Sequence, residues 1–293
     1  MTKRGLFVAC ISAMWLLLVC TSLGIAAEAQ LRFEVVNRQT VESRLRDYAR
    51  DDGIREARLK KMFSDAGCAK EISEQVVKHL PQPNLICVLP GQTDFTVIVG
   101  AHFDHVNAGD GVVDNWTGAA LLPSLFQGLR TSPHRHTYIF VAFAGEEKGL
   151  LGSETYVNNM TEEQVAHTDA MINMDSLGLA PSEVWLTHAD KQLALILFAV
   201  AKAMNAPLSA VNVDNVGSTD SESFARRKIP RITVHSVTQQ TLRILHTSRD
   251  KLDAINLADY FQSYRLLAAY LAYLDTALPG GSPTAAHVKM PPK

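Results

Sequence analysis

The chain has 293 residues, of which 47% are hydrophobic and 20% are charged, an ordinary composition for a globular protein. Its formal net charge of -2 provides no basic field, which argues against a protein that binds nucleic acid or a membrane surface. The length is common for a single α/β domain.

The first 29 residues have the pattern of a secretory signal peptide. Lys3 and Arg4 precede the apolar run Leu6–Ile25, and an A-x-A cleavage site ends at Ala29. The apolar segment approaches the length of a bilayer span, so an uncleaved anchor is the alternative, although the A-x-A site favours cleavage. We therefore expect a signal peptide at 1–29, a secreted or periplasmic protein, and no stable membrane partner.

Cleavage would leave two of the four cysteines, Cys68 and Cys87. An exported chain with an even number of cysteines can form a disulfide, and two isolated buried thiols fit the sequence equally well. The spacing of the two residues does not match a cysteine-based zinc site.

Helices are predicted first along the chain, and strands alternate with helices after them. Val41–Lys70 carries apolar residues every three or four positions, and its charge cluster Arg55–Lys61 is typical of a solvated helix face. A second helix is predicted at Lys70–Leu80. Runs suited to strands follow at Asn84–Leu89, Phe95–Gly100, Thr137–Phe143, Ala170–Met174, Val184–His188 and Ile232–Ser236. Helical segments lie among them at Thr117–Arg130, Gly149–Asn159, Lys191–Asn205, Glu222–Lys228 and Leu257–Leu278.

This alternation predicts an α/β fold, a three-layer sandwich around a mostly parallel, mixed central sheet. The sequence has no internal repeat, low-complexity tract or domain linker, so one domain is expected over 30–278. Residues 279–293 are rich in Pro, Gly and Ala and are predicted to form a flexible tail.

Acidic and histidine residues follow the ends of several predicted strands, where ligand sites gather in open α/β sheets. Each has a simpler interpretation on its own, because an Asp after a strand is usually a helix cap and neighbouring Glu residues are usually solvated. Their recurrence at strand after strand favours a shared site. The residues are His102, Asp104, Asp114, Glu146, Glu147, Asp175 and His246.

The residue types fit a hydrolytic site with two metal ions. Imidazole and carboxylate ligands suit zinc, and two zinc ions about 3.5–4 Å apart need a shared carboxylate. Two His and three acids supply two terminal ligands for each metal and one bridge. One further carboxylate then stays off the metals and can act as a general base on water.

Five segments, AHFDH, DNWTG, FAGEEKGLLGS, NMDS and HTSRD, resemble in this order the motifs of the secreted di-zinc leucyl aminopeptidase family. Relatives of that family include plasma glutamate carboxypeptidase and the glutaminyl cyclases. The resemblance covers about residues 85 to 275 and implies a fold of the zinc-exopeptidase type, with a zinc peptidase domain over 30–278.

The resemblance also implies a role for each site residue. It makes five residues metal ligands, with two for each of two Zn²⁺ ions and one bridge: His102 and Asp175, Glu147 and His246, and the bridge Asp114. Glu146 is implied as the general base. Asp104 is implied to orient a ligand imidazole without touching the metals.

The sequence departs from the family pattern at one position. Many relatives have S-D-H-x-x-F before the last strand, whereas residues 218–224 read STDSESF, with Ser221 in place of the His. The departure concerns the substrate pocket and not the metal site.

We therefore expect an aminopeptidase that hydrolyses the first bond of peptides with a free N-terminus. The resemblance favours an apolar first residue such as Leu. One alternative is a single-zinc cyclotransferase like glutaminyl cyclase, although such enzymes tend to have D-S at Asp114-Asn115 and Trp at Leu245. The other alternative is a binding module that kept the fold and lost catalysis, against which the complete set of ligands and base argues.

Overall fold

The computed structural model describes residues 33–68, 72–212 and 217–281. The predicted signal peptide at 1–29 lies outside these residues, as does the predicted tail from 282 onward. The first residues of that tail form a short 3-10 helix, Pro279–Gly281. Among the described helices, none combines the length and the hydrophobicity needed to cross a bilayer.

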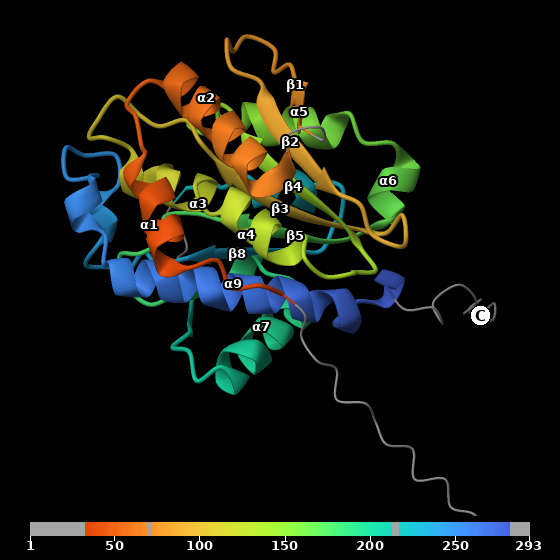
Figure 1. The fold of residues 1–293 in the computed structure, drawn as a ribbon. Coiled ribbons are helices and arrows are strands. Elements are labelled where there is room, and N and C mark those ends of the chain that lie inside the picture. Colours follow the sequence, from red (N-terminus) through yellow and green to blue (C-terminus); the bar gives the residue numbers. More distant parts are fainter. Residues whose placement is uncertain (1–32, 69–71, 213–216, 282–293) are drawn as a thin grey trace, which may run out of the picture. The chain divides into compact units, whose positions relative to one another are not determined.

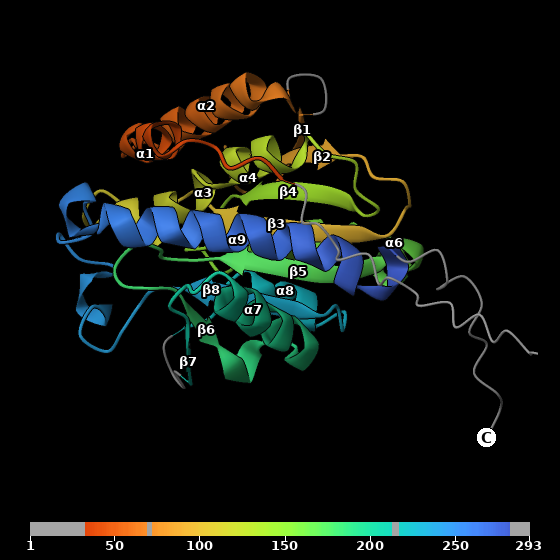
Figure 2. The ribbon, with the colours of Figure 1, turned by 60° about the horizontal axis from the view of Figure 1, so that its bottom comes forward.

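The described residues form a mixed sheet of eight strands in the order β1-β2-β4-β3-β5-β8-β6-β7 (Figures 1 and 2). The central strands β4, β3, β5 and β8 are parallel, β1 and β2 are antiparallel at one edge, and β6 runs antiparallel to β8 near the other. The strands are β1 Ile72–Gln75, β2 Asn84–Leu89, β3 Thr96–His102, β4 Thr137–Phe143, β5 Thr168–Met174, β6 Glu183–Trp185, β7 Ser209–Val211 and β8 Arg231–His235.

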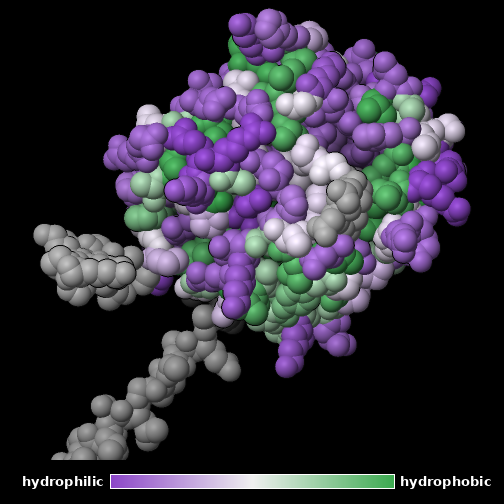
Figure 3. Space-filling model, turned by 180° about the vertical axis from the view of Figure 1, so that it is seen from behind, coloured by the Kyte–Doolittle hydropathy of each residue, from purple (hydrophilic) through white to green (hydrophobic). Residues whose placement is uncertain are grey.

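Helices cover both faces of this sheet (Figures 1 and 2). They are α1 Arg38–Arg46, α2 Asp52–Phe63, α3 Thr117–Ala119, α4 Leu122–Leu129, α5 Leu151–Asn158, α6 Glu162–Ala166, α7 Lys191–Ala203, α8 Ser221–Ala225 and α9 Leu257–Ala277. Because successive side chains of a strand point to opposite faces, β3 contributes Val97 and Val99 to the core beneath α4 and α9, and Ile98 to a second core that includes Phe224 of α8. This arrangement confirms the predicted three-layer α/β sandwich. Figure 3 shows the molecule from the other side, where hydrophobic residues lie among hydrophilic ones, as on most protein surfaces.

The predicted helix Lys70–Leu80 is wrong where the structure describes it, because Ile72–Gln75 forms β1. This strand pairs antiparallel with β2, from Ile72 opposite Cys87 to Gln75 opposite Asn84. The segment lies at the sheet edge, where pairing with a distant strand outweighs a weak local preference.

The predicted helix Val41–Lys70 is divided into α1 and α2. The second helix begins after Asp51, whose carboxylate accepts a hydrogen bond from the backbone N–H of Ile54. This cap marks the start of α2 as a helix separate from α1. The prediction extended one apolar period across both helices and missed the cap between them.

Other boundaries also differ from the prediction. Thr117–Arg130 divides into α3 and α4, and the strand predicted at Val184–His188 ends at Trp185 and continues as a 3-10 turn. The short elements α6 and β7 were not predicted. A capping box between Thr161 and Gln164 starts α6, and this box is a local signal that sequence analysis overlooked.

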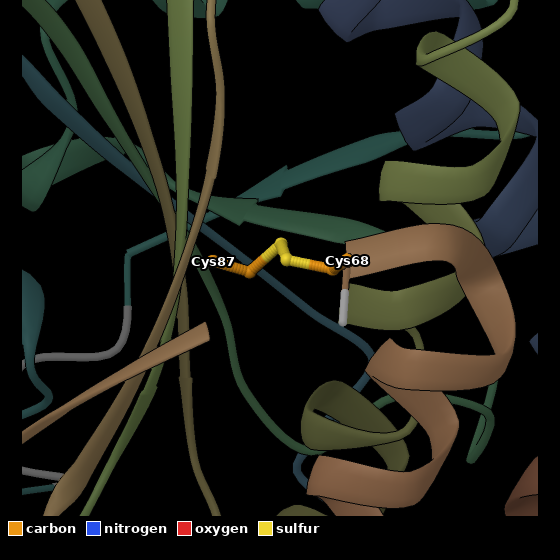
Figure 4. The surroundings of a disulfide bond; sticks show 2 residues. All are labelled: Cys68 and Cys87. Carbon is orange, nitrogen blue, oxygen red and sulfur yellow. A yellow bond between two sulfur atoms is a disulfide. The ribbon is translucent and has the colours of Figure 1, made fainter. Parts of the chain in front are cut away.

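Cys68 and Cys87 form a disulfide that joins the end of the α2 segment to β2 (Figure 4). Both residues are buried, and their Cα atoms are 6.3 Å apart, within the usual range for a disulfide. The sequence left a disulfide and two free thiols open, and the structure contains the disulfide.

Candidate metal centre

The residues that sequence analysis selected at the strand ends lie close together at the edge of the sheet where the parallel strands end. His102 is the last residue of β3, Asp175 follows β5, and Glu146 and Glu147 follow β4. Parallel strands end at the same edge, which explains why segments far apart in sequence meet there. Together with Asp114 and His246, the three acids after β4 and β5 line a pocket of about 1110 Å³.

Asp114 lies at the centre of this group, and its two carboxylate oxygens face different partners. Oδ1 is 3.2 Å from Nε2 of His102, which is 3.9 Å from Oδ1 of Asp175. Oδ2 is 3.1 Å from Nε2 of His246, which is 3.2 Å from Oε2 of Glu147. The potential ligand atoms of each group lie within 4.8 Å of one another. The structure thus contains two adjacent groups of donors that share one carboxylate.

Hydrogen bonds from outside the two groups hold the turn that carries Asp114. Asp250 accepts the N–H of Val113 at 2.6 Å and the N–H of Asp114 at 3.2 Å. Sequence analysis quoted Asp250 within the segment HTSRD but assigned it no role. Because Asp250 lies four residues after His246, one loop supplies both a candidate metal ligand and the acceptor that holds the backbone of Asp114.

The structure explains the Asn and the Gly of the segment DNWTG. The Asn115 amide donates to the Met174 carbonyl at 2.9 Å, and its oxygen accepts the N–H groups of Gly118 and Ser176 at 3.0 and 3.1 Å. Asn115 therefore ties the turn of Asp114 to the end of β5. A Cβ at Gly118 would lie 2.7 Å from the Asn115 oxygen and 2.8 Å from the Met174 carbonyl, too close for any larger residue.

Arg55 is fully buried, so the interpretation of 55–61 as a solvated helix face is wrong for this residue. Its guanidinium donates to the carbonyls of Phe103, Asp110 and Gly111 at 2.7 to 2.8 Å, and to that of Ala49 at 2.6 Å. Burial, opposed by nearby carboxylates, lowers the pKa of Arg55 to about 10, which leaves it charged at neutral pH. It fastens the backbone between His102 and Asp114. Composition cannot reveal this role, because it depends on what packs over the helix.

Asp104 supports residues on two strand ends. Its carboxylate accepts the backbone N–H of Glu146 at 3.0 Å and that of Glu147 at 3.2 Å. Its carbonyl oxygen lies 3.1 Å from Nδ1 of His102, whereas its carboxylate is 3.7 Å from the same nitrogen. The carbonyl is thus the nearer partner of the imidazole, and the carboxylate holds the Glu pair.

Burial and neighbouring charges shift the acidity of the Glu pair. For Glu146, burial has the largest influence, His102 opposes it, and Asp220 adds to it, so the pKa rises to about 10. Burial and the charge of Asp114 raise the pKa of Glu147 to about 7. A bound cation reverses such shifts because it becomes the largest local charge.

The donor set fits a divalent cation. Burial opposes ionisation of Asp114, but hydrogen bonds from His102 and His246 outweigh it and lower the pKa. Oε1 of Glu147 is buried without a hydrogen-bond partner among the residues that the structure describes. Buried carboxylate oxygens beside imidazole nitrogens are the ligands that zinc prefers in proteins.

Asp220 is a buried acid whose charge acts on Glu146, and sequence analysis assigned it no role. It is fully buried, and within the described part of the chain neither of its carboxylate oxygens has a hydrogen-bond partner. Burial is the main reason that its pKa rises to about 7. Asp220 stands in the segment STDSESF, directly before Ser221, the residue at which this segment departs from the family pattern.

The structure thus combines a three-layer α/β fold with a candidate metal centre at one edge of its sheet. The chain belongs to Peptidase family M28, whose family model matches residues 84–271.

Individual relatives agree with this membership. The chain is 31% identical over 133 residues to a probable leucine aminopeptidase of Trichophyton verrucosum, a match that covers 41% of this chain and 36% of that protein. A zinc aminopeptidase structure from Bacillus subtilis matches with a TM-score of 0.60 and 24% identity, over 65% of this chain and 49% of the other. A glutaminyl cyclase structure from an Acidobacteriales bacterium matches with a TM-score of 0.73 and 19% identity, over 85% and 98%. Both structures share the fold, and the chain spans about a third of the length of the Trichophyton relative.

Proposed function

We propose that this protein is a zinc-dependent aminopeptidase, which hydrolyses the first peptide bond of peptides with a free N-terminus. The observation that carries the proposal is Asp114, whose two oxygens face two separate groups of one His and one acid. Membership of Peptidase family M28 supports the reaction class, and the similarity to a probable leucine aminopeptidase and to a zinc aminopeptidase supports zinc and the aminopeptidase activity.

In this proposal, each of the two groups holds one Zn²⁺ ion. His102 and Asp175 would hold the first, Glu147 and His246 would hold the second, and Asp114 would be shared by both. Two zinc ions would supply Lewis acidity, which polarises the scissile carbonyl and makes water a nucleophile near neutral pH.

Glu146 is proposed as the general base. It lines the same pocket but belongs to neither donor group, and its backbone is fixed by Asp104. Its carboxylate takes a proton from the attacking water as the C–O bond forms. It then gives this proton to the amine that leaves as the C–N bond breaks, so the carboxylate is regenerated.

The acids of the pocket favour a substrate with a free amine. Glu146, Glu147 and Asp175 line the same pocket, and a protonated amine gains charge-assisted hydrogen bonds from carboxylates. An acetylated amine brings no charge and needs more room. This preference makes the enzyme an exopeptidase.

We also propose that the chain is exported, with a signal peptide at 1–29, a zinc peptidase domain at 30–278 and a flexible tail at 279–293. The disulfide between Cys68 and Cys87 supports export, because disulfides persist mainly in oxidising compartments.

A glutaminyl cyclotransferase is the second candidate, since the glutaminyl cyclase fold matches over almost its whole length. One experiment separates the two. Zinc-loaded protein is incubated with a peptide panel that has free or acetylated N-termini, and the products are identified by mass spectrometry while bound zinc is counted. Release of single residues from free N-termini alone, with two zinc ions per chain, supports the aminopeptidase. Equal cleavage of acetylated peptides, or loss of ammonia from Gln-initiated peptides without cleavage, contradicts it.

A further inference from the structure

One wall of the pocket is built by the face of the sheet that β6 and β8 share. Glu183 of β6 pairs directly opposite His235 of β8, and Val184 opposite Val234. The two Val side chains point into the core beneath α7 and α9. Side chains alternate along a strand, so the opposite face carries the wall residues, which all line the pocket: Glu183, Trp185, Thr233 and His235. We call this face the β6–β8 wall.

His235 presents a hydrogen-bond donor to the wall. Its Nδ1 accepts the backbone N–H of Val237 at 3.1 Å, and burial lowers the pKa of His235 to about 4, so the ring is neutral and its proton lies on Nε2. His235 is 7% exposed, and its Nε2 has no hydrogen-bond partner among the described residues.

Trp185 presents a second donor. Its ring stacks on His188 with the centroids 4.2 Å apart, which fixes the indole in place. The residue is 8% exposed, and its indole N–H also lacks a partner within the described ranges. Buried donors are nearly always hydrogen-bonded, so two unpaired ones on one wall mark the place of a ligand group.

Glu183 adds an acceptor. One carboxylate oxygen accepts the Ser209 hydroxyl at 3.0 Å, and the other is buried with no partner in the described part of the chain. Thr233, in contrast, is satisfied, because its hydroxyl donates to Ser221 at 2.9 Å. Ser221, the residue that replaces the His of many relatives, thus pairs with Thr233, and within the described residues the other three side chains of the wall each keep an unpaired atom.

The side chain of the first substrate residue is the group that reaches the wall. Four of the proposed metal ligands and Glu146 line the same pocket as the wall, and in the proposed reaction they would engage the scissile carbonyl and the amine. The rest of a peptide must lead out to solvent, because its length varies. Trp185 and His235 are nine-tenths buried and line the same pocket as Glu146, so a side chain that enters this pocket beside the proposed base can approach them.

We propose that the β6–β8 wall selects a first residue with a carboxamide side chain, asparagine or glutamine, an inference that rests on the proposed aminopeptidase activity. A carboxamide oxygen accepts from Trp185 and His235, and its NH₂ donates to Glu183. The ammonium of a Lys side chain cannot accept a hydrogen bond from the N–H of Trp185 or of His235, and the carboxylate of an Asp or Glu side chain is repelled by Glu183. An aliphatic side chain leaves all three groups of the wall unpaired. The wall therefore opposes the apolar preference that the family resemblance implied.

The test compares Asn-initiated and Leu-initiated peptides, whose first side chains have nearly the same shape. Asn is used because Gln could also cyclise. The zinc-loaded enzyme is expected to favour Asn in kcat/KM by at least about tenfold, since two or three hydrogen bonds distinguish the substrates. Trp185→Phe keeps a smaller aromatic ring and removes the indole N–H, and it is expected to reduce this preference by about three- to tenfold. Tyr156→Phe, which changes a partly buried aromatic residue outside this pocket, is the matched control and is expected to leave the ratio unchanged.

Calorimetric binding of free asparagine and leucine to the same proteins provides a second measurement. Asparagine is expected to bind more tightly, and Trp185→Phe to narrow the difference. If Leu peptides are cleaved better than Asn peptides and Trp185→Phe does not alter the ratio, the wall does not select a carboxamide, although the aminopeptidase function stands. If no peptide is cleaved, the proposed aminopeptidase function is wrong. Equal binding of asparagine and leucine would then also contradict the selection of a carboxamide by the β6–β8 wall.

Discussion

Replacing Arg55 by Met should loosen the backbone that carries His102 and Asp114. Arg55→Met keeps most of the side-chain volume but removes the donors to four carbonyls. The bonds to Phe103 and Gly111 are buried, and an unsatisfied buried acceptor costs about 1–3 kcal/mol. We therefore expect the free energy of unfolding to fall by about 4 kcal/mol.

Thermal and denaturant unfolding measure this change, with and without added zinc. For a domain of this size, about 4 kcal/mol lowers Tm by roughly 8–16 °C. The matched control is Arg58→Met, one turn further along α2, where the half-exposed guanidinium contacts the Tyr48 carbonyl and Asp47. Exposed ion pairs contribute about 0–1 kcal/mol, so this variant should unfold almost as the wild type does.

Zinc binding is a second readout of the same variant. Because Arg55 fastens the segment between two proposed ligands, Arg55→Met should weaken zinc binding as well as the fold, whereas Arg58→Met should change neither. Equal unfolding curves and equal zinc affinity for the two variants would refute the argument that Arg55 organises this segment.

Three further predictions concern single residues. Asp114→Asn should lose most of both zinc ions, because a neutral amide bridges two cations poorly, and metal analysis that finds two zinc ions per chain would contradict the bridge. Glu146→Ala should lower kcat by about 10²–10⁴-fold with zinc content near normal, and loss of zinc would instead make Glu146 a ligand. Burial works against the charge of His136, but hydrogen bonds to Asp169 and Asp275 outweigh it and raise the pKa. The stability that His136 contributes should thus be complete below its ordinary pKa of about 6.5 and decline as pH rises through the higher folded value. The difference in unfolding free energy between wild type and His136→Gln, measured at pH 6 and pH 9, should therefore shrink at the higher pH.

Local sequence patterns predicted the elements that depend mainly on their own residues. The core strands β3, β4, β5 and β8 are short apolar runs, and α7 and α9 have long apolar periods, so each was recognised with boundaries close to those observed. The proposed ligands were found for a related reason. His102 ends β3, and Glu147 and Asp175 follow β4 and β5. Parallel strands bring their carboxyl ends to one edge, so linear order was enough to place these three residues near one another.

Features that depend on pairing between distant segments could not be predicted in this way. The strand β1 has no strand-like alternation and exists because β2 pairs with it, and the interruption between α1 and α2 depends on a single cap. Arg55 resembles a surface residue until the loop after β3 covers it.

The sequence by itself determined which residues could bind metal and which fold would carry them, because residue types and periodicities are local properties of the chain. Only the tertiary structure decided that the two oxygens of Asp114 face different pairs of side chains and that Trp185 and His235 line the same pocket as Glu146. The arrangement around Asp114 and the wall of the pocket depend on the register of strands and on loops that are far apart in the chain. Contacts of this kind stabilise the protein only when folding removes water from all the partners at once.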